Sequence, residues 1–227
     1  MRYVASYLIP HTSYLFILNL ISHFLVGFGL SFVGSLPFGM INLEVARTAV
    51  RKGIPPALWV AAGASLVEML QVYVALKFTS LFAENPAVEK WFQIISIVVF
   101  FGLGIYYFFF AKIKPVPTGE LEPPGRRRHK LMKGMFLSTI NLMAIPYWIF
   151  YGTLLTAHNM LDKQDLYIIV FSVGTAVGVF VLLILYSMLG AKILRKSAQV
   201  TAWLNVFIGL VLVAFGVFQL WDMMNGG

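Results

Sequence analysis

Glu68 is the residue of this sequence whose type and position point most directly to chemistry. It stands near the middle of the apolar run AAGASLVEMLQVYV, and Gln71 follows one turn later, on the same face of a helix. A carboxylate in apolar surroundings is costly unless it pairs with a cation or takes up a proton. Glu68 and Gln71 therefore predict a site for a cationic solute or a proton, with a structural hydrogen bond to a neighbouring helix as the alternative.

A second candidate site lies at residues 34–44, which read GSLPFGMINLE. Pro37 removes a backbone donor and Gly39 weakens helical structure, so we predict a broken helix here. The N-terminal amides of a second half-helix would suit a carboxylate, and Asn42 adds a neutral donor and acceptor one turn further on. A proline kink that serves packing alone is the alternative.

A similar interruption is predicted in the second part of the chain. Asn141, Pro146 and Tyr147 occupy the region that matches the first break. Proline again disfavours a continuous helix. Aromatic packing is the alternative role for Tyr147 and its neighbours.

Other chemistries find little support in the sequence. The four histidines are scattered, cysteine is absent, and neither an HExxH pattern nor a glycine-rich nucleotide motif occurs. We therefore predict no catalytic residue, no metal site and no bound cofactor. The basic residues form short clusters between apolar runs rather than one face, so a nucleic-acid partner is not expected.

The composition places these residues in lipid. Of the 227 residues, 59% are hydrophobic and only 11% are charged, whereas soluble domains carry about 25% charged residues. A membrane-spanning helix needs roughly 20 apolar residues. Such runs predict an all-α integral membrane protein with about six spans, at residues 14–35, 56–80, 91–111, 133–157, 166–190 and 201–221.

The placement of positive charge predicts the orientation of the chain. Thirteen of the 17 Lys and Arg residues lie in or beside the first, third and fifth loops. Positively charged loops stay in the cytoplasm, so both termini are expected outside. The run RRRHK, from Arg126 to Lys130, fits this topogenic role; binding of anionic lipids is the alternative.

Internal similarity suggests two related halves. The separation between Gly63 and Gly174 is nearly the same as that between Pro37 and Pro146. A tryptophan also precedes a glycine at one fixed spacing in the third and sixth spans (Trp91 and Gly104, Trp203 and Gly216). We predict two three-helix halves, residues 1–112 and 133–227, joined by a basic, proline-rich loop at 113–132, with the broken first span extending to residue 50. Three spans per half would invert the second half; chance similarity is the alternative.

Two segments resemble the signature of the lysine exporter (LysE) and homoserine/threonine exporter (RhtB) superfamily. They are GSLPFGMINL followed by RTAVRKG, and GASLVE in the second span. The matching positions are Pro37, Asn42, Gly53, Gly63 and Glu68. In the second half the family has Asn-Pro-x-Ala, whereas this chain has Leu142 in place of the proline. Pro146 is expected to supply that break instead.

The resemblance implies a secondary transporter, not an enzyme, that exports amino acids or similar small metabolites across a bacterial inner membrane as a proton-driven antiporter. Its partners would be the solute, protons and the lipid bilayer, with a homodimer as an option. Two alternatives stay open. A cation or metal exporter would need more ligands than Glu68 inside the membrane, and a membrane scaffold would use its polar residues only to join helices.

Overall fold

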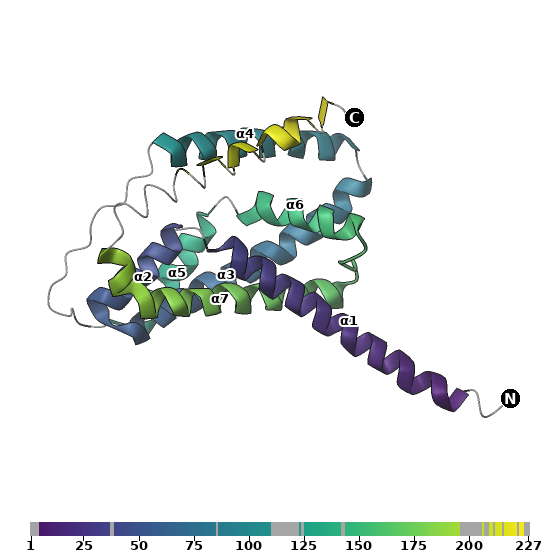
Figure 1. The fold of residues 1–227 in the computed structure, drawn as a ribbon, viewed down its shortest axis with the longest axis horizontal. Helices are drawn as coiled ribbons and strands as arrows, with labels where there is room; N and C mark the ends of the chain where they lie inside the picture. Colours follow the sequence, from purple (N-terminus) through teal and green to yellow (C-terminus); the bar gives the residue numbers. More distant parts are fainter. Residues whose placement is uncertain are drawn as a thin grey trace.

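The computed structural model of the chain describes residues 5–36, 39–84, 86–109, 123, 125–141, 144–195 and parts of 206–224. All regular structure in these residues is helical (Figure 1). The helices are α1 (Ala5–Gly34), α2 (Met40–Lys52), α3 (Ile54–Glu84), α4 (Pro86–Phe109), α5 (Arg127–Thr139), α6 (Ala144–Ala157) and α7 (Asp165–Arg195), followed by short helical pieces between 206 and 224. The predicted all-α class is confirmed, as expected where lipid leaves every backbone polar group to be paired within its own segment.

Three helices are long and apolar enough to cross a membrane, within the described residues. They cover Tyr14–Gly34, Ile54–Thr79 and Asp165–Leu189, and they match the predicted first, second and fifth spans. The predicted fourth span corresponds to α5 and α6, which pass the same test together but are bent by 63°. The predicted third span lies largely in α4, and much of the sixth lies outside the described residues, so the count of six stays a prediction.

The predicted break near Pro37 is present between α1 and α2. Helix α1 ends at Gly34 and α2 begins at Met40, while Pro37 itself lies outside the described residues. Gly39 is the N-cap of α2, with an extended backbone and no side-chain cap. Helix α2 then runs to Lys52 and stops at Gly53, whose φ of 91° is in the region that glycine tolerates best.

The second break is also present, although its place differs from the proline that predicted it. Helix α5 ends at Thr139 and α6 begins at Ala144, so the interruption lies at residues 140–143. Pro146 stands in the first turn of α6, where a missing backbone donor costs nothing. Helix α5 also begins at Arg127 rather than near residue 133, because the helix-breaking residues end at Gly125 and nothing after them opposes helix formation.

Helices α3 and α5 meet so closely that glycine is required on both sides. A side chain at Gly63 of α3 would overlap the Leu131 carbonyl of α5. A side chain at Gly134 of α5 would overlap the Val60 carbonyl of α3. The two backbones are therefore in direct contact, as at small-residue interfaces between membrane helices.

Helices α1 and α7 repeat this contact. A side chain at Gly174 of α7 would overlap the Phe24 carbonyl, and one at Gly27 of α1 would overlap the Phe171 carbonyl. Gly63 and Gly174 are the two glycines that the internal similarity of the sequence places at equivalent positions. Both close contacts thus join the long helix of one predicted half to the broken span of the other.

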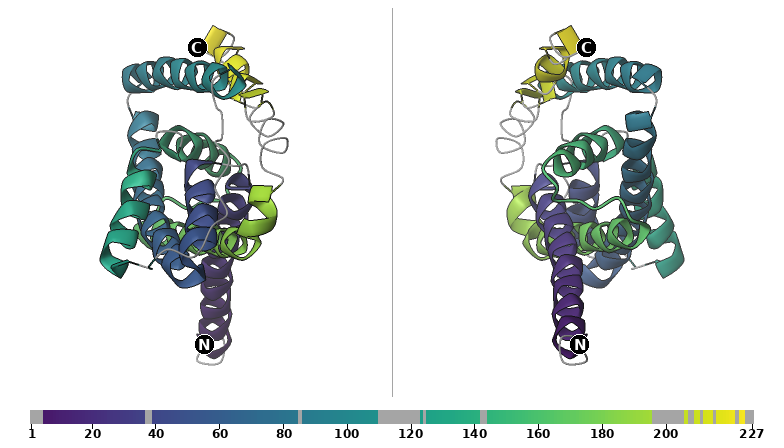
Figure 2. Two further views of the ribbon diagram at one scale, coloured as in Figure 1. Left: turned by 90° about the vertical axis from the view of Figure 1, so that its left-hand side faces the viewer. Right: turned by 90° about the vertical axis from the view of Figure 1, so that its right-hand side faces the viewer.

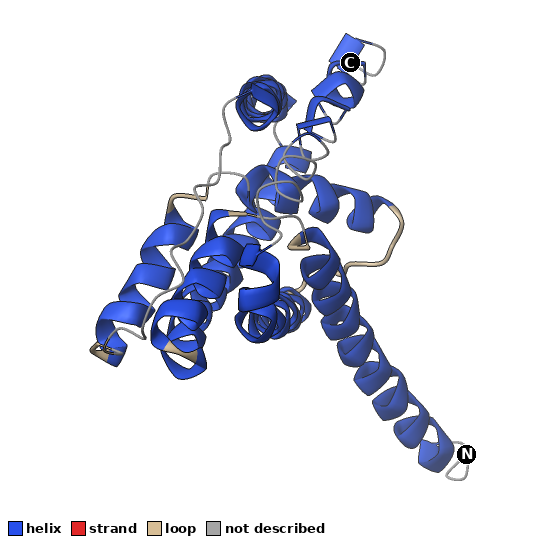
Figure 3. Cartoon of the chain, turned by 60° about the vertical axis from the view of Figure 1, so that its left-hand side comes forward, coloured by secondary structure: helices blue, strands red, loops and turns tan. Residues whose placement is uncertain are grey.

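Helix α4 lies away from the other helices and alongside the C-terminal segment (Figures 1 and 2). Gly104 of α4 and Gly209 of the C-terminal segment form the contact, because a side chain at Gly209 would stand 3.0 Å from the Gly104 carbonyl. The N-terminal part of α1 extends beyond the rest of the structure (Figure 3) and exposes Tyr14 and Leu15. Such apolar exposure fits a chain whose solvent is lipid.

Candidate functional site

Glu68 lies at the contact between α3 and α1. Its carboxylate accepts a hydrogen bond of 3.1 Å from the hydroxyl of Ser31, which is only 1% exposed. The structure therefore gives Glu68 a polar partner on another helix. A single neutral hydroxyl leaves acceptor capacity on the carboxylate, since an ionised carboxyl group offers about four lone-pair positions.

Tyr147 of α6 reaches the same turn of α1. Its hydroxyl donates a hydrogen bond of 3.2 Å to the carbonyl of Leu30, the residue directly before Ser31. Gly34 makes room for this tyrosine, because a side chain at Gly34 would overlap its hydroxyl. Tyr147 and Glu68, from the two predicted halves, thus meet α1 at neighbouring residues.

Gln71 connects α3 to the second break. Its side-chain nitrogen donates a hydrogen bond of 3.0 Å to the carbonyl of Ser138, and Ser138 also accepts the backbone N–H of Asn141 at 3.1 Å. The side-chain oxygen of Gln71 is buried without a hydrogen-bond partner among the described residues. A buried acceptor without a donor is costly, so it marks a place where a donor from a ligand would be stabilised.

Asn42 closes the first break rather than facing an open site. It is buried, and its side-chain nitrogen donates a hydrogen bond of 2.7 Å to the Ser35 carbonyl. The hydroxyl of Tyr186 in α7 donates to the Leu36 carbonyl at 2.7 Å and also contacts Asn42. The carbonyls that the break releases are therefore paired by side chains, as lipid-buried backbone requires.

The predicted site residues thus form two connected groups. Glu68 and Tyr147 meet at α1, and Gln71 and Asn141 meet at Ser138; Glu68 and Gln71 stand one turn apart on α3. Of the remaining predictions, Asn42 and Gly39 lie at the start of α2, Pro146 lies in the first turn of α6, and Pro37 is outside the described residues.

The sequence-based prediction missed the serines and Tyr186. Ser31 and Ser138 are each 1% exposed, and each comes shortly before one of the two breaks. A serine shortly before each predicted break was the signal in the sequence that could have drawn attention to them. Tyr186 had no such signal, because only the packing of α7 brings it to the break.

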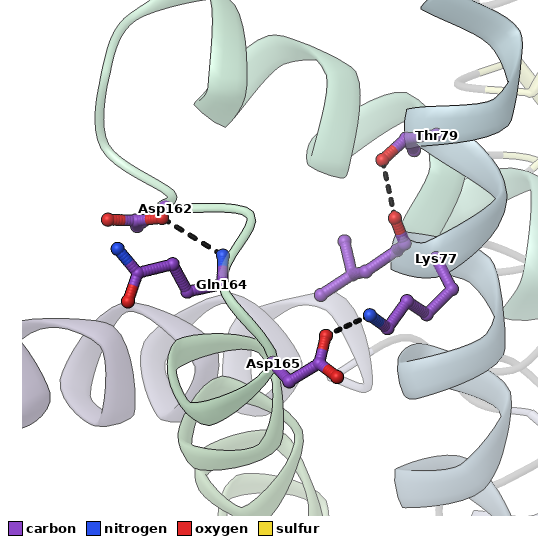
Figure 4. A network of polar contacts seen from close by, with 6 residues as sticks. Lys77, Thr79, Asp162, Gln164 and Asp165 are labelled. Carbon is purple, nitrogen blue, oxygen red and sulfur yellow. Dashed lines mark hydrogen bonds and ion pairs between the residues drawn. The ribbon is translucent and has the colours of Figure 1, made fainter.

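Two ion pairs lie along this bundle, near different ends of α3. Glu44 of α2 accepts from Lys133 of α5 at 2.5 Å and from Thr48 at 3.0 Å. Lys77 of α3 pairs with Asp165 at the start of α7 (Figure 4). Lys133 is next to Gly134, which contacts α3 near Gly63. The stretch of α3 from Gly63 to Lys77 is about 21 Å long at the rise of an α-helix, so the two pairs lie far apart along α3. Each pair joins one predicted half to the other.

Comparison with known proteins supports a transport role for the chain. A family model described as LysE type translocator matches residues 32–222, a region that contains Glu68, Gln71, both breaks and Tyr147. No curated protein and no solved structure matches the chain. In the described part of the chain, no group of three or more His, Cys, Asp or Glu residues is placed to hold a metal ion.

Proposed function

The chain belongs to the LysE type translocator family, and we propose that it exports amino acids or similar small metabolites across a bacterial inner membrane in exchange for protons. The family supports a membrane transporter; the solute class, the coupling ion and the direction are the proposal. The observation that carries it is the position of Glu68, an acid of α3 bonded to a buried serine of α1 that comes shortly before the first helix break.

We propose two kinds of recognition for a zwitterionic solute. The spare acceptor positions of Glu68 and the side-chain oxygen of Gln71 would bind an ammonium group. The N-terminal amides of α2, which no side chain caps, would bind a carboxylate through the partial positive charge of the helix terminus. Tyr147 would close this site from α6.

We propose that the two halves alternate between inward-facing and outward-facing arrangements around this site. Residues 1–112 and 133–227 would be the moving units, with three spans each and the second half inverted. The Glu44–Lys133 and Lys77–Asp165 pairs join the halves at separate places. One pair would open in the inward-facing arrangement, and the other would open in the outward-facing arrangement. Protonation of Glu68 would release an ammonium group, which couples proton entry to solute exit.

The proton gradient gives this exchange its direction, while the topology proposed from the sequence gives the orientation of the chain. Both termini would lie outside, with the basic segments of α2 and α5 in the cytoplasm. The gradient of protons across an inner membrane would then favour export. The oligomeric state, including a homodimer, does not enter this mechanism.

Transport by the purified protein tests the proposal directly. Proteoliposomes loaded with a mixture of amino acids and divalent cations would be placed in a more acidic medium, and efflux of each component would be measured by mass spectrometry. We expect amino-acid efflux that collapses when a protonophore is added. Selective cation efflux would favour the metal-exporter alternative, and the absence of any flux from correctly folded, reconstituted protein would favour a scaffold.

A further inference from the structure

His23 of α1 is a buried titratable residue that the proposed transport site does not use. It is 7% exposed, and its Nε2 accepts the backbone N–H of Asp162 at 3.0 Å. Asp162 lies in the connection between α6 and α7, which consists of residues 158–164. His23 therefore joins this connection to α1, across 139 positions of the sequence.

Two hydrogen bonds fix the position of the proton on the neutral ring. A backbone N–H can only donate, so Nε2 of His23 must offer a lone pair to Asp162. The ring proton then lies on Nδ1, which donates to the Asn19 carbonyl at 2.6 Å. Both nitrogens of the neutral ring are thus used, and each holds the ring to a different segment of backbone.

The polar side chains of the connection do not replace the backbone N–H at the ring. The carboxylate of Asp162 accepts the backbone N–H of Gln164 at 2.9 Å. The other titratable residues of the connection, His158 and Lys163, are exposed. In the described part of the chain, the hydrogen bond from the connection to His23 therefore comes from a backbone N–H and not from a charged group.

The helices packed against α1 add one titratable group beside the ring. Tyr167 of α7 stacks on the imidazole of His23, with 4.6 Å between the ring centroids. Asp165, at the start of α7, is engaged in an ion pair with α3 (Figure 4). Glu68 of α3 and Tyr147 of α6 meet α1 seven or eight residues further on, roughly 10 Å or more along the helix.

A proton on Nε2 would break the link between α1 and the connection. A charged imidazole donates from both nitrogens, so Nε2–H of His23 would face the N–H of Asp162, and two donors cannot form a hydrogen bond. A buried imidazolium is also costly unless water or a carboxylate reaches it. Because the ring is held by Asn19 and Tyr167, the connection is the part that must move.

This movement would act where α3 and α7 are joined. Leu161, which precedes Asp162, is 5% exposed and belongs to the same buried cluster as Trp148 and Phe171. Asp165, three residues after Asp162, pairs with Lys77. Release of the connection would therefore withdraw a buried side chain and loosen the ion pair at this end of the bundle.

We propose that His23 binds a second proton, separate from any proton on Glu68, and that it links the α6–α7 connection to α1 only while its ring is neutral. Histidine is the side chain that ordinarily changes charge between about pH 5 and 8. The topology predicted from the sequence places the connection outside, so an acidic exterior would open the outer end. The proposed function enters only through that orientation; the link itself depends on the contacts of His23 alone.

Distance measurement by electron paramagnetic resonance, on the purified chain in lipid nanodiscs, tests the link. The chain has no cysteine, so M160C in the connection and M188C in α7, both at exposed methionines, can carry the two spin labels. Position 188 lies about 35 Å along α7 from its start, a span that the method resolves. We expect one narrow distribution at about pH 7.5 and an added, broader population at about pH 5.5.

Four variants identify the titrating group. Glutamine keeps an acceptor for the Asp162 N–H but takes up no proton, so H23Q should stay narrow at both pH values. H158Q is the matched control, because His158 is exposed and bonds the carbonyl four residues earlier as His23 does; it should respond like the wild type. D162N keeps the backbone N–H and should respond as well. E68Q should also respond, which separates this proton from the one proposed for transport.

Several outcomes would overturn the proposal. Identical distributions of the wild type at both pH values would mean that no such switch exists. A full response in H23Q would place the proton elsewhere, and a loss of the response in D162N, H158Q or E68Q would assign it to that residue. An H23Q protein that is already broad at about pH 7.5 would show that the acceptor does not hold the connection. If the variants behave as expected while proteoliposomes show no efflux, the His23 link stands and the proposed transport function fails.

Discussion

The carboxylate of Glu68 in α3 and the hydroxyl of Ser31 in α1 are joined by a hydrogen bond of 3.1 Å. The residue before Ser31, Leu30, accepts the hydroxyl of Tyr147 from α6. One turn of α1 therefore connects an acidic residue of the first predicted half with an aromatic residue of the second. A rearrangement of α6 relative to α1 would change the surroundings of Glu68. An exchange transporter needs such a link between the movement of its halves and its binding site.

Replacement of Glu68 by Gln should lower proton-coupled efflux by roughly tenfold or more, because an amide cannot release and bind a proton in the transport cycle. The S31A variant should have a smaller effect, of about fivefold, since it removes one hydrogen bond worth about 1 kcal/mol. E89Q, an acidic position in α4, is the matched control and should transport normally. Efflux from proteoliposomes is the measurement; full activity in E68Q would exclude Glu68 from the coupling step.

The G34A variant should impair transport without loss of stability. Alanine at Gly34 would overlap the Tyr147 hydroxyl and displace it from Leu30, while alanine in place of glycine stabilises a helix by about 0.5–1 kcal/mol. Y147F should give a similar reduction in efflux, because both changes remove the same hydrogen bond. The double variant should then be no worse than either single variant. Additive losses would show that the two residues act separately.

The positions of the helix breaks could be predicted from the sequence better than the residues that contact the predicted site. Proline and glycine act on the local backbone, so the break between α1 and α2 could be placed from residues 34–39 alone. The second break was displaced because Pro146 fits without strain in the first turn of α6. The partner of Glu68 could not be predicted, because Ser31 is distant in the sequence and only helix packing brings it close. The same holds for Lys133 and Glu44, which come from different predicted halves.

The close contact between α3 and α5 makes a prediction about stability. Alanine at Gly134 would overlap the Val60 carbonyl, a backbone atom that cannot rotate away, so the helices must separate. We expect G134A to destabilise the protein by about 1–3 kcal/mol, the usual cost of overpacking. G29A is the control, because nothing lies within 4 Å of a side chain at that helical position. Thermal unfolding in detergent should therefore separate the two alanine variants, and equal midpoints would contradict the contact.

The Glu44–Lys133 pair predicts an effect on transport that exceeds its effect on stability. The side chains are 20% and 47% exposed, and exposed ion pairs contribute only about 0–1 kcal/mol, so neither E44Q nor K133Q should shift the unfolding midpoint much. If the pair closes one end of the transport path, each single variant should leave that end open more often and lower the coupling of efflux to the proton gradient. The charge exchange E44K/K133E should restore the pair and much of the coupling, whereas the same exchange at Lys77 and Asp165 should act on the other end.

Accessibility of a cysteine at Gln71 to membrane-impermeant reagents, added from each side of oriented vesicles, distinguishes the two ends. Unchanged labelling in all four single-site variants (E44Q, K133Q, K77Q and D165N) would show that these ion pairs do not control access.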